Sequence, residues 1–142
     1  MIQFIGLMMA SVIRIHEVID FTCSDYELMC DCVMAEAGGE DMQTQEAVAT
    51  VILNRVYCED KFPATVQEVI MEPNQFSVRY NGNVTDQVRL SVLHALIIYG
   101  TLDQDISKSC YYFRAHHYHT KLGIPYRKIG RLYFSLAENA TD

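Results

Sequence analysis

The chain has 142 residues, which suits one domain, and 50% of them are hydrophobic, so it can bury a core without metals or disulfides. With 20% charged residues and a formal net charge of −7, its composition is that of a globular protein, not a disordered one. Its Lys and Arg residues are scattered, which excludes a nucleic-acid partner and gives no general attraction to anionic membranes.

The first 22 residues begin with an apolar run over residues 1–13 and are predicted to form an N-terminal extension that serves as a core element, with a weak export signal as the alternative. The apolar run is shorter than the roughly 18 residues that a membrane-spanning helix needs. No Lys or Arg precedes it, as would be typical of a secretory signal. We therefore expect no integral membrane segment, one domain over residues 23–136 and a polar tail over 137–142.

The cysteines indicate a reducing compartment. Their odd number and irregular spacing fit no disulfide framework, and the nearest pair, Cys30 and Cys32, is one residue short of a redox or zinc motif. We expect reduced, mostly buried, structural thiols and therefore synthesis in a reducing cytosol. The five residues are Cys23, Cys30, Cys32, Cys58 and Cys110.

The first predicted helix follows the apolar segment. Ser24 and Glu27 have the spacing of a capping box, which predicts a helix over residues 25–37. Gly38 and Gly39 are expected to end this helix, because glycine tolerates the left-handed conformation that is common at helix ends.

Apolar periodicity and capping residues predict three further helices, over residues 43–57, 65–71 and 86–99. A polar loop over residues 77–85 separates the last two. Residues 110–113 and 132–134 are aromatic and are predicted to be short strands, with a loop rich in His and Lys between them. The order indicates a helix-dominated α+β domain with a small extended portion in its C-terminal third.

Four spaced blocks carry a resemblance to a known family. In chain order they are residues 33–40 (VMAEAGGE), 45–56 (QEAVATVILNRV), 62–77 (FPATV, then VI and P-x-QFS) and the pair 111–113 with 129–134 (YYF and IGRLYF). In this order they resemble the SleB/CwlJ family of cell-wall hydrolases. The resemblance extends over roughly residues 25–135.

This resemblance implies a lysozyme-like fold and a peptidoglycan glycan strand as the partner. Members cut the bond from N-acetylmuramic acid to N-acetylglucosamine as lytic transglycosylases or muramidase-like glycosidases, in spore cortex, vegetative cells or phage lysis. We expect a monomer without cofactor or metal. We also expect that it is made in the cytoplasm of a bacterium or phage-infected cell and acts on the cell wall or spore cortex.

Two glutamates match the family motif. Glycosidic cleavage needs a carboxylic acid that still holds its proton near neutral pH. Glu36 lies in the last turn of the predicted helix, at the negative end of its dipole, which is expected to raise the pKa of its carboxyl. We favour Glu36 over Glu40 as the acid, because the helix fixes it more firmly than the glycine-rich exit fixes Glu40. In a hydrolytic mechanism Glu40 would be the second carboxylate.

Polar residues of the second and third blocks are candidates for substrate binding. Asn54 interrupts an apolar helical face, where it either orients the acid or an N-acetyl group, or is satisfied by backbone. Its neighbour Arg55 is expected to form a structural ion pair. Gln75 and Phe76 are predicted to line the sugar groove, with core packing as the alternative for Phe76.

Tyrosines supply the remaining candidates. Tyr111 and Tyr112 alternate along an extended segment, so one of them is expected to face the groove. Many family members have a Trp-rich stretch before the final Ile-Gly, but this chain has no Trp. Tyr118 and Tyr126 are therefore the predicted stacking surfaces in that region.

Other chemistries are less well supported by the sequence. His116, His117 and His119 with Cys110 resemble a zinc site only weakly, because their spacing fits no usual ligand pattern. Cys110 with His94 or His116 would be a Cys–His nucleophile, but no motif supports it. The main alternative is a non-catalytic peptidoglycan-binding protein, or a virion or spore-coat component with a degenerate hydrolase fold.

Overall fold

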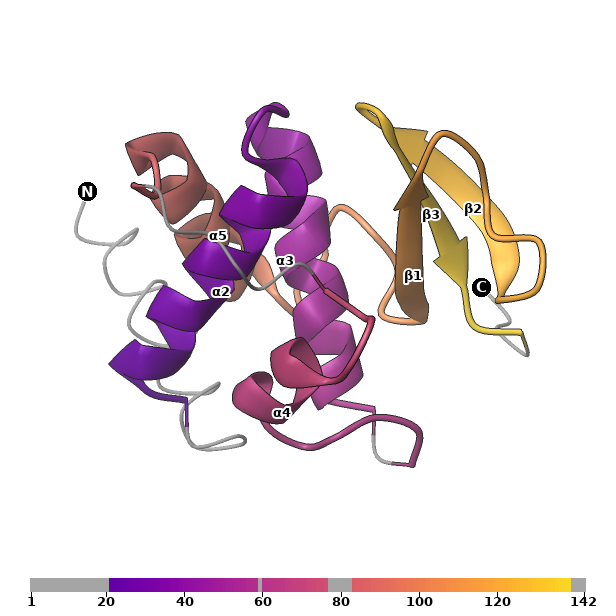
Figure 1. Ribbon diagram of the computed structural model, residues 1–142, viewed down its shortest axis with the longest axis horizontal. Coiled ribbons are helices and arrows are strands. Elements are labelled where there is room, and N and C mark those ends of the chain that lie inside the picture. The colour runs from indigo at the N-terminus through magenta and orange to yellow at the C-terminus, as the bar shows by residue number, and fades with distance from the viewer. Residues whose placement is uncertain (1–20, 59, 77–82, 139–142) are drawn as a thin grey trace.

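The computed structural model describes residues 21–58, 60–76 and 83–138. Within these residues helices precede strands in the order α2 (Cys23–Ala37), α3 (Met42–Val56), α4 (Val66–Met71), α5 (Asp86–Ile98), β1 (Cys110–Ala115), β2 (Ile124–Ile129) and β3 (Leu132–Leu136) (Figure 1). This confirms the helix-dominated α+β prediction. The predicted N-terminal extension, the loop at 77–85 and the polar tail lie largely outside the described residues.

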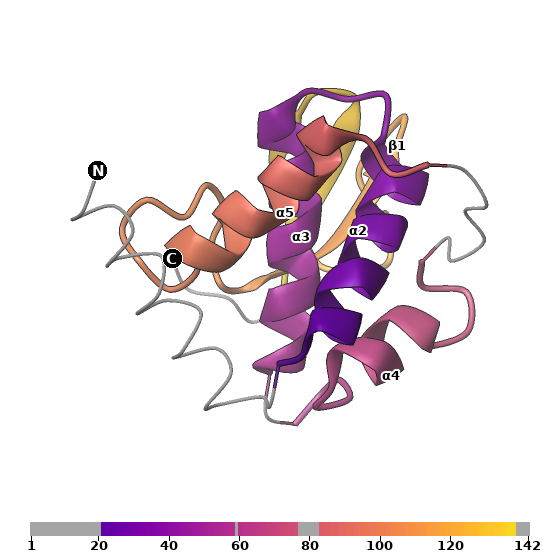
Figure 2. The ribbon, with the colours of Figure 1, turned by 90° about the vertical axis from the view of Figure 1, so that its left-hand side faces the viewer.

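Helix α3 lies at the centre of the domain. In Figure 1, α2 and α5 lie on one side of α3 and the sheet on the other, and Figure 2 shows the helices in front of the sheet. Every residue of α3 from Thr44 to Val56 is buried. The predicted apolar stripe is therefore only part of the buried surface, and the polar residues of α3 need partners inside the protein. No helix among the described residues has the length and apolar character to cross a membrane.

The start of α2 differs from the prediction. Its N-cap is Thr22, whose hydroxyl accepts a hydrogen bond from the Asp25 amide at 3.2 Å, while the Thr22 amide donates to the Asp25 carboxylate at 2.9 Å. The predicted capping pair of Ser24 and Glu27 is wrong, because Thr22 and Asp25 offer the same spacing two residues earlier. Glu27 instead forms an ion pair with Arg89 at 3.0 Å.

The end of α2 also has a different physical basis. Gly38 ends the helix with φ −60° and ψ −29°, so the predicted left-handed stop is wrong. Glycine is needed here for space, because a Cβ at this position would lie 2.5 Å from the Met34 carbonyl oxygen. The short turn that follows leads directly into α3.

Asp41 caps α3. Its carboxylate accepts hydrogen bonds from the Thr44 amide at 2.9 Å and from the Thr44 hydroxyl at 2.7 Å. This cap satisfies one of the free amides in the first turn of α3. It also fixes the chain immediately after Glu40.

The three strands form an antiparallel sheet in the order β1-β3-β2. Both predicted strands are confirmed and are slightly longer than predicted. Strand β2 was not predicted, because it is an exposed edge strand with a Pro and no apolar alternation. A two-residue hairpin connects β2 to β3, and its first residue, Gly130, has φ 58°, which glycine adopts without strain.

All five cysteines lie within the described residues, and none forms a disulfide. Cys30, Cys32 and Cys110 are buried, Cys58 is half-buried and Cys23 is exposed. Burial raises the pKa of the Cys30 thiol to about 11 and raises that of Cys32 further. These two thiols are therefore uncharged and unreactive at neutral pH, as expected for structural cysteines.

We predict that a thiol-specific reagent added to the native protein at neutral pH will modify Cys23 rapidly and Cys58 more slowly. Cys30, Cys32 and Cys110 should react only in denaturant, because the reagent cannot reach their sulfur atoms. Mass spectrometry of the alkylated peptides measures each position separately. Rapid modification of Cys30 or Cys110 in the native protein would contradict this packing.

A second prediction concerns the α3 cap. Asp41→Ala should lower the free energy of unfolding at pH 7 by about 1 kcal/mol, because the Thr44 amide loses its acceptor. Hydrogen bonds from the hydroxyl and then the amide of Thr44 lower the pKa of Asp41. Its contribution is therefore complete above the unfolded pKa of about 3.9 and is lost as the pH falls through the lower folded value.

Urea unfolding at pH 7 and at about pH 3 measures this difference for the wild-type protein and Asp41→Ala. Asp41→Asn is the matched control, because Asn is also a good N-cap and does not titrate. It should stay close to the wild type at pH 7. An equal loss of stability in the Asn and Ala variants would show that the cap is not the cause.

Candidate active site

Two adjoining cavities form a cleft between the end of α2 and the sheet. The first, the sheet half, has a volume of about 420 Å³ and is lined by Glu36, Glu40, Ala115, His116, Lys128, Arg131, Leu132 and Tyr133. The second, the loop half, also measures about 420 Å³ and is lined by Glu36, Asn74, Gln75, Phe76, Phe113, Arg114, Ala115 and Leu132. Glu36, Ala115 and Leu132 line both halves, so Glu36 lies where they meet.

Glu36 is half-buried in the last turn of α2. Met29 and Val33 lie seven and three residues before Glu36, on the same side of the helix, and both are almost completely buried in the core, as is Ala37. Because that side cannot rotate without exposing apolar surface, the helix fixes the direction of the Glu36 side chain.

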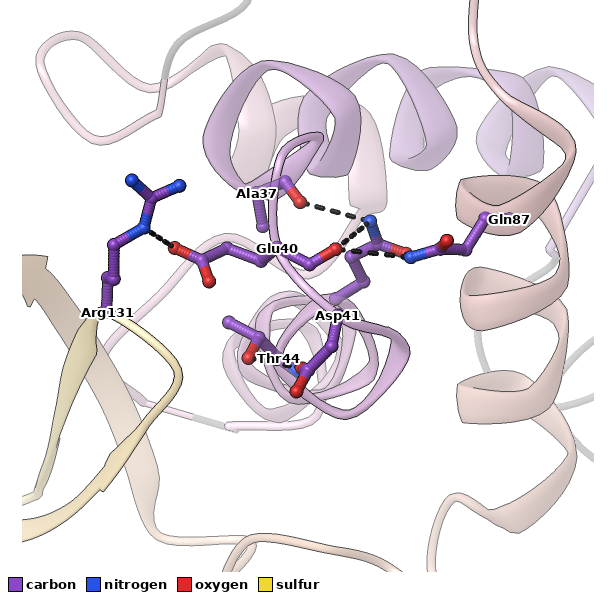
Figure 3. Close-up of polar contacts among 7 residues, drawn as sticks. Ala37, Glu40, Asp41, Thr44, Gln87 and Arg131 are labelled. Atoms are coloured by element: carbon purple, nitrogen blue, oxygen red, sulfur yellow. Dashed lines mark hydrogen bonds and ion pairs between the residues drawn. The ribbon is translucent and has the colours of Figure 1, made fainter.

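Glu40 is held by the β2–β3 hairpin (Figure 3). Its Oε1 accepts a hydrogen bond from Arg131 Nε at 2.9 Å; the Glu40 side chain is 13% exposed and that of Arg131 is 79% exposed. The Gly130 backbone approaches so closely that a Cβ there would lie 2.8 Å from Glu40 Oε2. The Glu40 carboxylate is therefore paired and enclosed, whereas the outer part of the Arg131 guanidinium faces solvent.

The buried amide of Gln45 fixes the turn between α2 and α3, which follows Glu36 and carries Glu40. Its Nε2 donates to the carbonyl oxygens of Ala37 and Glu40, each at 3.1 Å, and its Oε1 accepts from the Ser91 hydroxyl at 2.8 Å. Gln87 adds a second hydrogen bond to the Glu40 carbonyl at 3.1 Å. The sequence-based site did not include Gln45, although an amide within an apolar helical face signals a buried polar contact.

Asn54 makes three hydrogen bonds within the protein. Its Nδ2 donates to the carbonyl oxygens of Ser107 at 3.0 Å and Cys110 at 2.9 Å, and its Oδ1 accepts from the Tyr99 hydroxyl at 3.0 Å. Asn54 is 1% exposed and is not among the residues that line the cleft. Asn54 was considered either for orienting the acid or an N-acetyl group, or as a buried amide satisfied within the protein. These contacts correspond to the second, structural role.

Arg55 is buried. It was expected to form an ion pair, but none of the ion pairs among the described residues includes it. Its guanidinium instead lies over the rings of Phe62 at 5.0 Å and Phe76 at 4.8 Å. It donates to the Tyr111 carbonyl at 2.8 Å and to Gln75 Oε1 at 3.1 Å. The planar cation thus uses aromatic faces in place of a carboxylate, and it holds Gln75 and Phe76 beside the cleft.

The predicted aromatic residues divide into two groups. Phe76 lines the loop half of the cleft, with its ring 6.1 Å from that of Phe113. Tyr111 and Tyr112 line neither half, although one of them was expected to face the groove. Tyr112 is buried, and Tyr111 packs on Phe62 with ring centroids 5.2 Å apart. An irregularity in the β1–β3 pairing at this point changes the alternation, and Phe113 lines the cleft.

Tyr118 lies beside the sheet half, where its ring and that of Tyr133 are nearly perpendicular with centroids 5.0 Å apart. Tyr133 itself lines the cleft. The sequence-based site missed most of the cleft lining; Lys128 and Arg131 were missed because they lie on β2 and the β2–β3 hairpin, which were not predicted. The missed lining residues are Asn74, Phe113, Arg114, Ala115, His116, Lys128, Arg131, Leu132 and Tyr133.

The rival chemistries find little geometric support. The described residues contain no group of three His, Cys, Asp or Glu side chains arranged to hold a metal ion. Cys110 is fully buried, which removes its sulfur from any substrate. His116 lines the sheet half of the cleft with φ 74°, a conformation that places it in a tight turn after β1.

A larger cavity of about 630 Å³ lies between α3 and α5, away from the cleft. Its walls are mostly apolar, and its Glu46 carboxylate is paired with His94 Nδ1 at 2.6 Å. Burial of Glu46 raises the pKa of its carboxyl. Neither motif glutamate lines this cavity, so the cleft remains the candidate active site.

Comparison with known proteins identifies the family of the chain. The family whose sequence model matches is described as Cell Wall Hydrolase, and the match covers residues 39–135. This range includes Glu40 and the whole sheet wall of the cleft, and it begins just after Glu36.

Several relatives are spore cortex-lytic enzymes. The chain is 40% identical to the enzyme of Oceanobacillus iheyensis over 80 residues. This aligned segment covers 54% of this chain and 29% of the relative. It is 42% identical to the enzyme of Bacillus cereus over 64 residues. This segment covers 45% of this chain and 24% of the relative. The aligned part therefore spans less than a third of the length of these relatives.

Solved structures extend the similarity to most of the chain. The catalytic domain of the Bacillus cereus SleB protein superposes with a TM-score of 0.67 at 29% identity, covering 81% of this chain and 91% of that domain. The catalytic domain of the germination-specific lytic transglycosylase SleB from Bacillus anthracis gives 0.65 at 30% identity, covering 81% and 96%. These matches confirm the lysozyme-like fold expected from the sequence. The chain therefore belongs to the cell wall hydrolase family and has the fold of the SleB catalytic domains.

Proposed function

We propose that the chain cleaves the peptidoglycan glycan strand between N-acetylmuramic acid and N-acetylglucosamine, as a lytic transglycosylase with Glu36 as its acid. The observation that carries this proposal is the position of Glu36, the acidic residue that lines both halves of the cleft. A strand that occupies both halves would have a glycosidic bond beside this carboxyl. The name of the similar Bacillus anthracis protein, a lytic transglycosylase, supports the same reaction class.

Glu40 has a positioning role in this proposal. One of its oxygens already accepts a hydrogen bond from Arg131, and Gly130 closes over the other. The leaving oxygen would therefore receive its proton from Glu36. The Glu40–Arg131 pair joins the α2–α3 turn to the β2–β3 hairpin and so sets the width of the sheet half.

One carboxyl group is sufficient for the proposed reaction. Glu36 donates its proton to the bridging oxygen as the bond from muramic C1 to that oxygen breaks, and the bonding electrons leave with the oxygen. The Glu36 carboxylate then accepts the proton of the C6 hydroxyl while O6 bonds to C1, closing a 1,6-anhydro ring. Glu36 is protonated again at the end, and the reaction consumes no water.

The loop half offers contacts for a sugar. The rings of Phe76 and Phe113 present apolar surface on which a pyranose can stack. Gln75 is exposed, and its Oε1 is bonded to Arg55, so its Nε2 is directed to donate to a sugar hydroxyl or N-acetyl oxygen. We propose that these three residues bind the sugar on one side of the cut bond. Tyr133, with Tyr118 behind it, would do so on the other side.

The setting of the reaction is also part of the proposal. We infer that the protein acts as a monomer on the cell wall or spore cortex after synthesis in the cytoplasm. Residues of this one chain line both halves of the cleft, which supports the monomer. A non-catalytic peptidoglycan-binding protein with the same fold is the competing function.

We predict that Glu36→Gln lowers muropeptide release from purified peptidoglycan at least about 100-fold, because the leaving oxygen loses its proton donor. Glu40→Gln should reduce the rate by roughly tenfold, because it weakens a positioning contact. Glu27→Gln is the matched control: it lies on the same helix, is exposed and lies outside the cleft lining, so it should release muropeptides at the wild-type rate.

Mass spectrometry of the released fragments measures both the rate and the chemistry. The proposal predicts 1,6-anhydro-muramic ends. Reducing ends would contradict transglycosylation, and full activity of Glu36→Gln would remove the proposed acid. A wild-type protein that sediments with the wall but releases no fragment would favour the non-catalytic function.

A further inference from the structure

A row of cationic and aromatic side chains crosses the sheet beside the cleft. Tyr133 on β3 pairs directly with Arg114 on β1 and with Lys128 on β2. Residues directly opposite in antiparallel strands point to the same face of a sheet, so these three side chains lie together. Lys128 Nζ lies 5.3 Å from the centre of the Tyr133 ring. We call these three residues the cation row.

The charges of this row are not neutralised by the protein. The chain carries 18 acidic and 11 basic residues, so carboxylates are abundant. Nevertheless, neither Arg114 nor Lys128 takes part in the ion pairs found among the described residues, and both are exposed. Two exposed cations without an ion-pair partner on the same sheet face are available to an external anion.

The row lies against the site proposed for catalysis. Lys128 and Tyr133 line the sheet half of the cleft, and Arg114 lines the loop half. The two cations therefore flank the position of Glu36, one on each side. An anionic group on the strand within reach of the cut bond would meet one of them.

We propose, on the basis of the proposed function, that Arg114 and Lys128 bind carboxylate groups of the peptide stems attached to N-acetylmuramic acid. The sugars in the strand are neutral, whereas the stems carry free carboxylates and hang from the sugar whose bond is cut. Guanidinium and ammonium groups form charge-assisted hydrogen bonds with carboxylates. Tyr133, between the two cations, supplies a ring for the sugar that bears the stem.

The experiment measures co-sedimentation of the purified protein with two forms of the same cell wall. Both are first freed of teichoic acid, and one is then amidated with carbodiimide and ammonium, which converts carboxylates into neutral carboxamides. At low ionic strength we expect the wild type to bind the native wall roughly threefold to tenfold more tightly than the amidated wall. Added salt should reduce this preference.

Substitutions test whether the cation row causes the preference for the native wall. The double variant Arg114→Gln with Lys128→Gln should bind both walls with similar affinity. Lys108→Gln is the matched control, because Lys108 is exposed, precedes β1 and does not line the cleft, so this variant should keep the wild-type preference. Circular dichroism checks that each variant is folded.

An equal affinity of the wild type for both walls would overturn the inference, as would a preference that persists in the double variant. The measurement is repeated with walls that retain teichoic acid; a preference found only there would assign the cations to phosphate and would also overturn the inference. Binding is measured independently of cleavage, so a retained preference without muropeptide release would contradict the proposed function alone.

Discussion

The buried amide of Gln45 is the contact on which the geometry of the cleft depends. This one side chain, on the central helix α3, receives a hydrogen bond from Ser91 on α5 and donates to two carbonyls of the α2–α3 turn. Those carbonyls belong to Ala37, the residue after Glu36, and to Glu40 itself. The Ala37 carbonyl also accepts from the Glu40 amide and the Glu40 carbonyl from Gln87, so Gln45 adds a second hydrogen bond to each and ties the turn to α3 and α5.

The second wall of the cleft comes from a different part of the chain and is joined to the first by few contacts. The β2–β3 hairpin approaches Glu40 through Arg131 and Gly130, and the cleft opens between this contact and the Phe76 loop held by Arg55. One wall therefore carries carboxyl groups and the other carries cations and aromatic rings. Such an arrangement suits a neutral sugar chain that bears anionic branches.

The sequence predicts the parts of this architecture that have strong local signals. Helix α3 and strands β1 and β3 follow from apolar periodicity and aromatic runs, and the two glutamates follow from the family motif. Strand β2 has an exposed edge and a Pro, so it lacks an alternating pattern, and the wall with Lys128 was missed with it. Arg55 was predicted to form an ion pair, but its guanidinium packs on the rings of Phe62 and Phe76. This contact could not be predicted, because no local sequence pattern shows which distant side chains surround a buried arginine.

The most direct test of the account is the activity of Gln45→Met. Methionine keeps the volume of the side chain but removes its donor and acceptor, so the Ala37 carbonyl and the Ser91 hydroxyl each lose a contact to this side chain while the core stays filled. At a temperature where circular dichroism shows the variant fully folded, muropeptide release should fall at least about tenfold, because the turn no longer holds Glu40 and the end of the helix that carries Glu36 in place beside the cleft. Wild-type release by the folded variant would contradict the account.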